Sequence, residues 1–138
     1  MPEHALLELS RYRLEKSLEM LAAAKRDADV EDYASANNRA YYCIFHAIRA
    51  VLALDGEDFK KHSAVISRFT LHYLKTDILP RRYGALISNA ALIRNRSDYE
   101  DFYICSIEDT HKLLEGAESF YNAIADYLNS RFFETNND

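Results

Sequence analysis

The first group of residues with possible chemistry is the run Arg-Asn-Arg-Ser-Asp-Tyr that begins at Arg94. Arg94 continues, at helical spacing, an apolar stripe that contains Ile87 and Ile93, so its guanidinium is expected to leave a helix at the buried edge. A guanidinium in that position needs a specific partner. An anion in a cleft would serve, and so would the carboxylate of Asp98 or Glu100. Both interpretations are open at the level of sequence.

A second group lies in the most apolar stretch of the chain, around residues 40–48. Arg39, Tyr42 and His46 are spaced i, i+3 and i+7, which places them one above another on one helix face. Such a row would line a cleft with a guanidinium, a phenol and an imidazole, groups that bind phosphate. The alternative is structural: Arg39 would form a buried or interface ion pair, and His46 would be a hydrogen-bonded histidine of the core.

A third group is His62, which follows Lys60 and Lys61 directly. Two ammonium groups and an imidazole just before a helix start would hold an anion, because the N-terminus of a helix presents unpaired backbone N–H groups. The alternative is a solvated, charged loop. Lys61 is therefore a candidate phosphate-binding residue, and His62 a candidate for proton transfer.

The elements that position these groups are predicted to be helices. Only 3 Gly and 2 Pro punctuate 138 residues, too few for the turns of an all-β fold. Periodicity predicts helices over residues 6–28, 30–54, 63–74 and 81–96, a loop over 95–103, and a last helix that opens at a capping box from Ser106 to Asp109. Asp29 is the predicted N-cap of the second helix, with Asp32 at its third position.

These helices predict an all-α, antiparallel bundle of four to five helices in one domain over residues 1–132, with a frayed tail over 133–138. Residues 30–54 should be the central, most buried helix. The other residues expected to face the core are Leu7, Leu14, Leu18, Leu21, Val65, Phe69, Tyr73, Tyr83, Leu86, Ile87, Ala90, Ile93, Ile107, Leu114, Ala117, Tyr121, Ile124 and Leu128.

Composition narrows the class of function. The chain shows no Gly-rich phosphate loop and no cysteine-pair metal motif, and its two cysteines, Cys43 and Cys105, do not form a metal cluster. We therefore expect neither a metal nor a cofactor. The start carries no basic region before an apolar one, and no stretch is long and apolar enough to span a membrane, so a cytoplasmic protein is expected.

Charge is divided unevenly along the chain. The formal net charge is -5, from 17 basic and 22 acidic residues, which by itself disfavours nucleic acid as a partner. Residues 60–96, however, hold eight basic residues and one acid, a net +7, and the remainder sums to -12. Asymmetry of this size is what a basic site on an acidic body produces.

The three groups together resemble the HEPN superfamily. The resemblance rests on Asn37-Asn-Arg-Ala-Tyr-Tyr-Cys-Ile-Phe-His46, on Lys61-His-Ser63 and on Arg94-x-x-x-Asp98-Tyr99, and it spans residues 6–128. More narrowly, the chain is similar to a prokaryotic subfamily with an NRAYYA-F-A helix and an R-x-x-x-D-Y close. The resemblance implies a helical bundle that forms a homodimer and places one motif from each chain at a shared cleft.

The resemblance also implies an activity. Many HEPN proteins are metal-independent endoribonucleases, and a large prokaryotic group are toxins paired with a small nucleotidyltransferase antitoxin. Their motif is an Arg, then usually a polar residue, then a His a few residues further on. Arg94 and Asn95 match the first two positions, and Tyr99 stands where the His is expected. A tyrosine with an ordinary pKa of about 10 is barely ionised at neutral pH, so His62 or His46 would supply the imidazole if the fold brings it close.

In such toxins a Tyr two residues beyond the motif His receives adenylyl groups. The same offset from Tyr99 falls on Asp101, so Tyr99 and Tyr103 become the candidates for modification.

Two hypotheses from different classes follow. In the first, the protein is a ribonuclease toxin in which Arg94 clamps the phosphate, Asn95 orients it and Tyr99 or a histidine carries the proton, while Arg96 and the rest of the basic segment attract RNA. In the second, the same cleft binds a nucleotide, RNA or a nucleotidyltransferase partner without cleavage. A plainer alternative is a helical interaction module whose basic segment is only a solvated face.

Overall fold

The computed structural model describes residues 3–137, with side chains through Phe132, as a bundle of helices without a strand in that part of the chain. The helices are α1 (Glu3–Asp29), α2 (Tyr33–Leu54), α3 (His62–Phe69), a π-helical turn η1 (Thr70–Leu74), α4 (Tyr83–Tyr99) and α5 (Ile107–Asn137). The all-α prediction is confirmed, and α2 is the central helix: it packs against α1, α3, α4 and α5.

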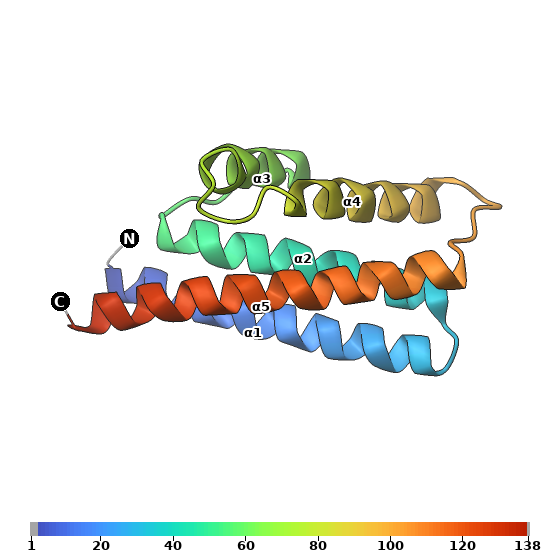
Figure 1. Cartoon of the computed structure of the whole chain (residues 1–138), viewed down its shortest axis with the longest axis horizontal. Helices are drawn as coiled ribbons and strands as arrows, with labels where there is room; N and C mark the ends of the chain where they lie inside the picture. The colour runs from blue at the N-terminus through green and yellow to red at the C-terminus, as the bar shows by residue number, and fades with distance from the viewer. Residues whose placement is uncertain (1–2, 138) are drawn as a thin grey trace.

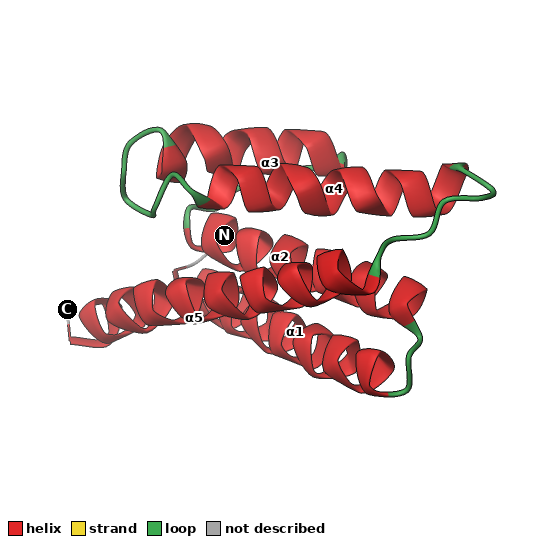
Figure 2. Cartoon of the chain, turned by 45° about the vertical axis from the view of Figure 1, so that its right-hand side comes forward, coloured by secondary structure: helices red, strands yellow, loops and turns green. Residues whose placement is uncertain are grey.

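The helices form two groups. The long helices α1, α2 and α5 lie side by side, and α3 and α4 cover α2 from the other side (Figure 1). Neighbouring α1 and α2 run in opposite directions, as do α4 and α5, so both described ends of the chain lie at the same end of the bundle (Figure 2). This arrangement brings the middle of α2, the start of α3 and the end of α4 together.

The core is continuous along α2, where Ile44, Ile48, Val51 and Leu52 are almost fully buried. The expected inward residues of the third and fourth helices are buried too, with Leu86 only partly so. Two expectations are wrong: Leu18 is 49% exposed and Ile107 is 55% exposed. Leu18 lies on the outer face of α1, because Ser10 and Ser17 occupy the face toward α2 instead, and Ile107 is the first residue of α5.

Three predicted boundaries are also corrected. The N-cap of α2 is Asp32 rather than Asp29, since its carboxylate accepts a hydrogen bond from the Ser35 N–H at 3.3 Å. The segment expected to form one helix over 63–74 is α3 followed by the π-helical turn. The loop predicted from residue 95 is wrong at its start, because α4 continues through Tyr99.

The predicted N-cap at Ser106 is confirmed by the bond that its hydroxyl accepts from the Asp109 N–H at 3.0 Å. Helix α5 covers residues 133–137 of the tail that was expected to fray, and Asp138 lies outside the described residues. Fraying of that last turn and the domain limit at 132 stay predictions.

Candidate functional site

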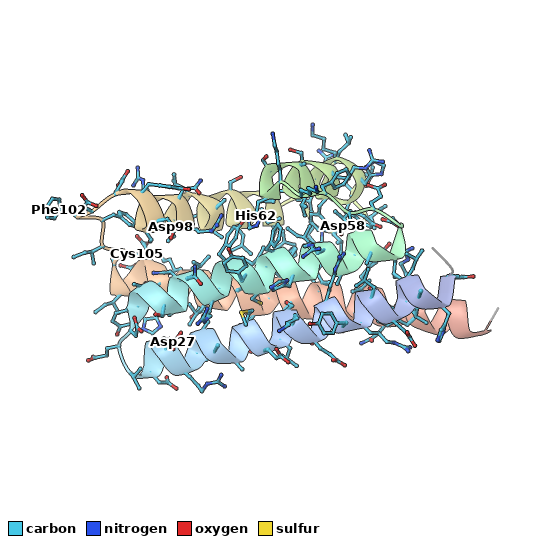
Figure 3. The ribbon with its side chains drawn as sticks, turned by 180° about the vertical axis from the view of Figure 1, so that it is seen from behind. Asp27, Asp58, His62, Asp98, Phe102 and Cys105 are labelled. Atoms are coloured by element: carbon cyan, nitrogen blue, oxygen red, sulfur yellow. The ribbon has the colours of Figure 1, made fainter. Side chains whose placement is uncertain are left out.

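One side-chain cluster contains members of all three groups found in the sequence. His62, the first residue of α3, lies against Tyr41 and Phe45 of α2, and Arg94 reaches it from α4. The Tyr41 hydroxyl is 2.8 Å from His62 Nδ1, and the Arg94 Nη1 is 3.5 Å from the same nitrogen. Figure 3 shows His62 between α3 and α2. Residues separated by 21 and 32 positions in the chain therefore meet at one imidazole nitrogen.

Aromatic packing holds the imidazole in place. The Phe45 ring stacks on His62 with centroids 4.0 Å apart and planes 22° apart. Tyr41 stacks more loosely on the same ring, at 5.9 Å, and Tyr42 approaches it edge-on at 6.0 Å. Three rings from one face of α2 thus restrict how His62 can turn.

The segment before α3 is anchored by an ion-pair network. Asp58 accepts from Arg49 and from Arg13, each at 3.2 Å, and Arg13 also donates to the Arg49 carbonyl oxygen at 3.3 Å. The Arg13 side chain is only 9% exposed, so the ion pairs of this network are partly shielded from water. The network ties the segment around Asp58 to α1 and α2. It sets where the chain enters α3, and so where His62 lies.

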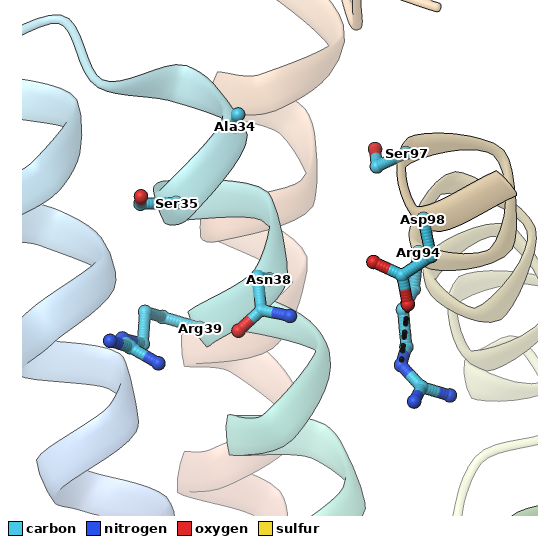
Figure 4. Close-up of a pocket in the computed structure, with 7 residues that line it drawn as sticks. All are labelled: Ala34, Ser35, Asn38, Arg39, Arg94, Ser97 and Asp98. Carbon is cyan, nitrogen blue, oxygen red and sulfur yellow. Dashed lines mark ion pairs between the residues drawn. The ribbon is translucent and has the colours of Figure 1, made fainter. Parts of the chain in front are cut away.

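Of the two kinds of partner that the sequence left open for Arg94, the structure contains the carboxylate, that of Asp98. Its guanidinium lies over the Tyr41 ring at 5.0 Å and the Tyr42 ring at 5.5 Å. Asp98, one turn further along α4, approaches Arg94 Nε at 3.7 Å (Figure 4). That contact is an ion pair without a hydrogen bond, and Nε is buried with no hydrogen-bond partner among the described residues. Arg94 Nη2, which has no hydrogen bond among the described residues, therefore keeps donor capacity for an anion.

The electrostatics of the cluster favour a neutral imidazole and a protonated phenol. Burial lowers the pKa of His62 below its ordinary value of 6.5, and the charges of Arg94 and Arg49 lower it further. Burial also raises the pKa of Tyr41 above 10, against a smaller opposite effect of Arg94. At neutral pH the hydroxyl of Tyr41 is therefore able to donate.

Three cavities meet at the cluster. The largest, about 710 Å³, lies between α3 and α4 and is lined by His62, Arg94, Lys61 and Asn95 among others. A second, of about 470 Å³, shares His62, and a third, of about 300 Å³, shares Arg94. The imidazole and the guanidinium thus stand at the junctions of a row of hollows along α2. A chain with a repeating anionic group would fit such a row.

Tyr99 does not join this cluster. It is the last residue of α4, 84% exposed and more than one turn beyond Arg94. The prediction that it replaces the motif histidine is not supported by its place in the fold, because α4 continues where a loop was expected. Arg96 is also directed elsewhere: its guanidinium lies 5.7 Å from the ring of Tyr103, which is partly buried.

The predicted row on α2 is brought only partly to the site. Tyr42 contacts both Arg94 and His62. Arg39 is exposed and lines only the smallest cavity, and Figure 4 shows its side chain directed away from Arg94. His46 is half-buried beside the Tyr42 ring at 6.0 Å. Among the described residues Arg39 forms no ion pair and His46 forms no hydrogen bond, so the buried form of the structural alternative is not seen. An ion pair of Arg39 across an interface stays a prediction.

Tyr41 is a site residue that the sequence analysis did not select, although it stands next to Tyr42 of the row. It is 3% exposed and touches both His62 and Arg94. The sequence did contain a sign of this face, because Tyr41 and Phe45 are four residues apart and such residues lie side by side on a helix. Nothing in the sequence showed that α3 would begin opposite that face.

The part of the chain that the structure describes lacks a metal-binding group and a membrane-spanning helix. No group of three or more His, Cys, Asp or Glu side chains there is arranged to hold a metal ion. None of the described helices has the length and apolarity needed to cross a bilayer.

Comparison with known proteins agrees with the all-α fold. The family model named HEPN domain matches residues 10–127. A protein named "Putative toxin MJ0605" from Methanocaldococcus jannaschii is 32% identical over 111 residues, covering 80% of this chain and 82% of its own. A "UPF0332 protein" from Thermotoga maritima is 29% identical over 117 residues, covering 85% and 89%. The matched span contains all the residues of the cluster.

Proposed function

This chain belongs to the HEPN domain family, whose relatives include proteins named as toxins, and from that premise we propose that it is a toxin that cleaves RNA without a metal ion. The observation that carries the proposal is the meeting of His62 and Arg94, 3.5 Å apart, at the junction of the cavities. The sequence lacks a histidine at the motif position, and the nearness of His62 to Arg94 supports His62 as the residue that takes its role.

The reaction is a transesterification within the RNA. The 2′-oxygen attacks phosphorus and gives its proton to water. The bond from phosphorus to O5′ breaks, its electron pair stays on O5′, and O5′ takes a proton from His62. The products are a 2′,3′-cyclic phosphate and a 5′-hydroxyl, and His62 regains its proton from solvent.

The roles follow from the position of each group. Arg94 binds the phosphate and stabilises the charge that builds on its oxygens, because its side chain lines two of the cavities and lies beside the imidazole. His62 acts as the general acid in its imidazolium form, which the lowered pKa makes the minor form at neutral pH but a stronger acid than free histidine. Asn95 and Lys61 line the adjacent cavity and would orient the RNA.

The same proposal includes the partners. We expect a homodimer that places two such clusters at one cleft, a small nucleotidyltransferase antitoxin, and residence in the cytoplasm, where RNA is available. Tyr99, whose ring is almost fully exposed, is the better candidate for adenylylation, since Tyr103 is partly buried. Modification of Tyr99, the residue after Asp98, would add negative charge within two helical turns of Arg94 and oppose RNA binding.

The experiment compares Arg94→Ala with Arg96→Ala on labelled RNA in the presence of a metal chelator. Arg94→Ala should slow cleavage by about 10²-fold or more, the typical effect of removing one charge-stabilising donor. Arg96→Ala removes the same charge two residues away, outside the cluster, and should retain activity. Both variants need the same thermal midpoint as the parent.

Three results would overturn this proposal: no cleavage of any RNA by the parent protein, equal rates for parent and Arg94→Ala, or cleavage that the chelator abolishes. Binding of RNA without cleavage, lost in Arg94→Ala, would establish the second hypothesis from the sequence, a non-catalytic binding protein. In that case binding should weaken steeply with salt.

A further inference from the structure

Two donors face one nitrogen of His62. A guanidinium only donates hydrogen bonds, so the Arg94 Nη1 at 3.5 Å requires an acceptor at His62 Nδ1. The Tyr41 hydroxyl at 2.8 Å is the shorter and stronger contact, and it donates to that same lone pair. A neutral imidazole has one donor and one acceptor nitrogen. With Nδ1 accepting, the proton of neutral His62 lies on Nε2.

The other nitrogen is free for a ligand. His62 Nε2 has no hydrogen-bond partner among the described residues. It is not a buried atom, so it reaches solvent. The imidazole itself lines the cavity of about 710 Å³ and the one of about 470 Å³. Nε2 is therefore the atom that an entering RNA would meet.

Tyr41 is held firmly enough to define this arrangement. Its side chain is 3% exposed, its ring stacks on Phe45 with planes 12° apart, and Arg94 covers it. The hydroxyl has His62 as its hydrogen-bond partner in the described part of the chain. A buried hydroxyl that turned away from Nδ1 would lose that bond without a replacement.

We propose that Tyr41 is a positioning residue for His62: its hydroxyl keeps the proton of the imidazole on Nε2 and aims that N–H into the cavities. A hydroxyl suits this task because it both donates and accepts. It donates to Nδ1 of the neutral ring and accepts from Nδ1–H of the imidazolium, so Nε2 carries a proton in both states. The inference rests on the proposed function, in which the imidazolium of His62 gives its Nε2 proton to O5′ of RNA and becomes a neutral ring.

Other charged groups around the ring do not offer an alternative anchor for Nδ1. Arg49 of α2 and Arg94 of α4 only donate, and both oppose the imidazolium. Asp58, in the segment before α3, accepts from Arg13 and Arg49. Lys60 and Lys61 precede the ring in the chain and carry positive charge. Among the described residues, the tyrosine hydroxyl is the group within hydrogen-bond distance of Nδ1 that can accept its proton.

The test is nitrogen NMR of the full chain with labelled histidine, comparing the parent with Tyr41→Phe and Tyr42→Phe. Both variants keep the aromatic ring, and the Tyr42 hydroxyl has no hydrogen bond among the described residues, so Tyr42→Phe is the matched control. The parent and the control should show His62 protonated on Nε2 at neutral pH. Tyr41→Phe should shift the Nδ1 resonance and populate the second tautomer.

A His62 that carries its proton on Nδ1 in the parent, or nitrogen resonances that Tyr41→Phe leaves in place, would overturn the inference. With RNA as substrate, Tyr41→Phe should slow cleavage by about tenfold, the effect expected from loss of one hydrogen bond. It should also change the dependence of the cleavage rate on pH. The expected tautomers in a protein that cleaves no RNA would uphold the role of Tyr41 and refute the proposed function. The two failures are therefore distinct.

Discussion

At the scale of single residues, the site combines groups that the sequence showed separately. Arg94 and His62 could each be named from local context, one at the end of an apolar stripe and the other beside two lysines. Their meeting could not, because it depends on the angle at which α3 leaves the ion-paired segment at Asp58. Tyr99 was misplaced for a local reason: α4 continues through it and leaves its ring in solvent.

His46 gives a test of the electrostatics that does not depend on catalysis. Burial lowers its pKa below 6.5, with smaller contributions from Arg49, Lys16 and Arg13. At a pH between the pKa of His46 in the folded chain and its higher pKa in the unfolded chain, the unfolded chain binds more protons. The contribution of His46 to the free energy of unfolding is therefore full above the unfolded-state pKa and falls as the pH drops through it. We predict that urea unfolding shows a smaller free energy at about pH 5.5 than at about pH 7.5.

His46→Gln should lose part of this dependence, because glutamine has no proton to take up. His62 retains its own share, since its pKa is lowered too. His111→Gln, at an exposed position, is the control and should behave as the parent. An undiminished loss of stability in His46→Gln would refute the electrostatic argument for this part of α2.

At the scale of elements, the contact of α1 with α2 shows what periodicity alone misses. The buried face of α1 includes leucines at 7, 14 and 21 and small residues at 10, 17 and 24, a heptad spacing. Reasoning from hydrophobicity selected Leu18 and omitted Ser10 and Ser17, because serine counts as polar. Their hydroxyls donate to the carbonyl oxygens of Ala50 and Cys43, each at 2.6 Å, and let the helices approach closely.

We therefore predict that Ser17→Ala destabilises the bundle by about 1 kcal/mol, the net worth of a buried hydrogen bond whose acceptor stays in place. Thermal or urea unfolding measures the change. Ser130→Ala, on the exposed face of α5, should change stability little. Equal stability of Ser17→Ala and the parent would mean that the serine contributes only its small volume.

A helix boundary could be predicted from the sequence where a capping residue marked it. It could not be predicted where tertiary packing determined the end of the helix. Ser106 caps α5 as its sequence indicated, through a bond to the Asp109 N–H. The end of α4 was placed too early, because polar residues in 95–99 resemble a loop although they continue the helix over an open cavity. A polar helix end beside a cavity has no hydrophobic periodicity from which to predict it.

At the scale of the whole molecule, the basic segment is less uniform than its sum suggested. Arg68 forms an ion pair with Glu57, Arg81 pairs with Asp77, and Arg82 lies over the Tyr83 ring. Those charges are occupied away from the cluster. The cavities receive Lys60, Lys61 and Arg94 from the segment, and Arg39 and Arg49 from α2.

The charge argument therefore holds for a narrower surface than residues 60–96. Five basic side chains line the row of cavities, with Asp58 and Asp98 among them as partial counter-charges. Such a surface attracts a polyanion locally while the acidic remainder of the bundle repels it. The sequence predicted the sign of this surface, and only the fold located it on α2, α3 and α4.

The central claim is that His62, rather than Tyr99, carries the proton beside Arg94. The most direct measurement is the single-turnover rate of RNA cleavage by His62→Gln and by Tyr99→Phe, each without an antitoxin. His62→Gln should be slower than the parent by about 10²-fold or more, the usual contribution of a general acid, and Tyr99→Phe should cleave at the parent rate. Loss of cleavage in Tyr99→Phe with full activity in His62→Gln would contradict the account.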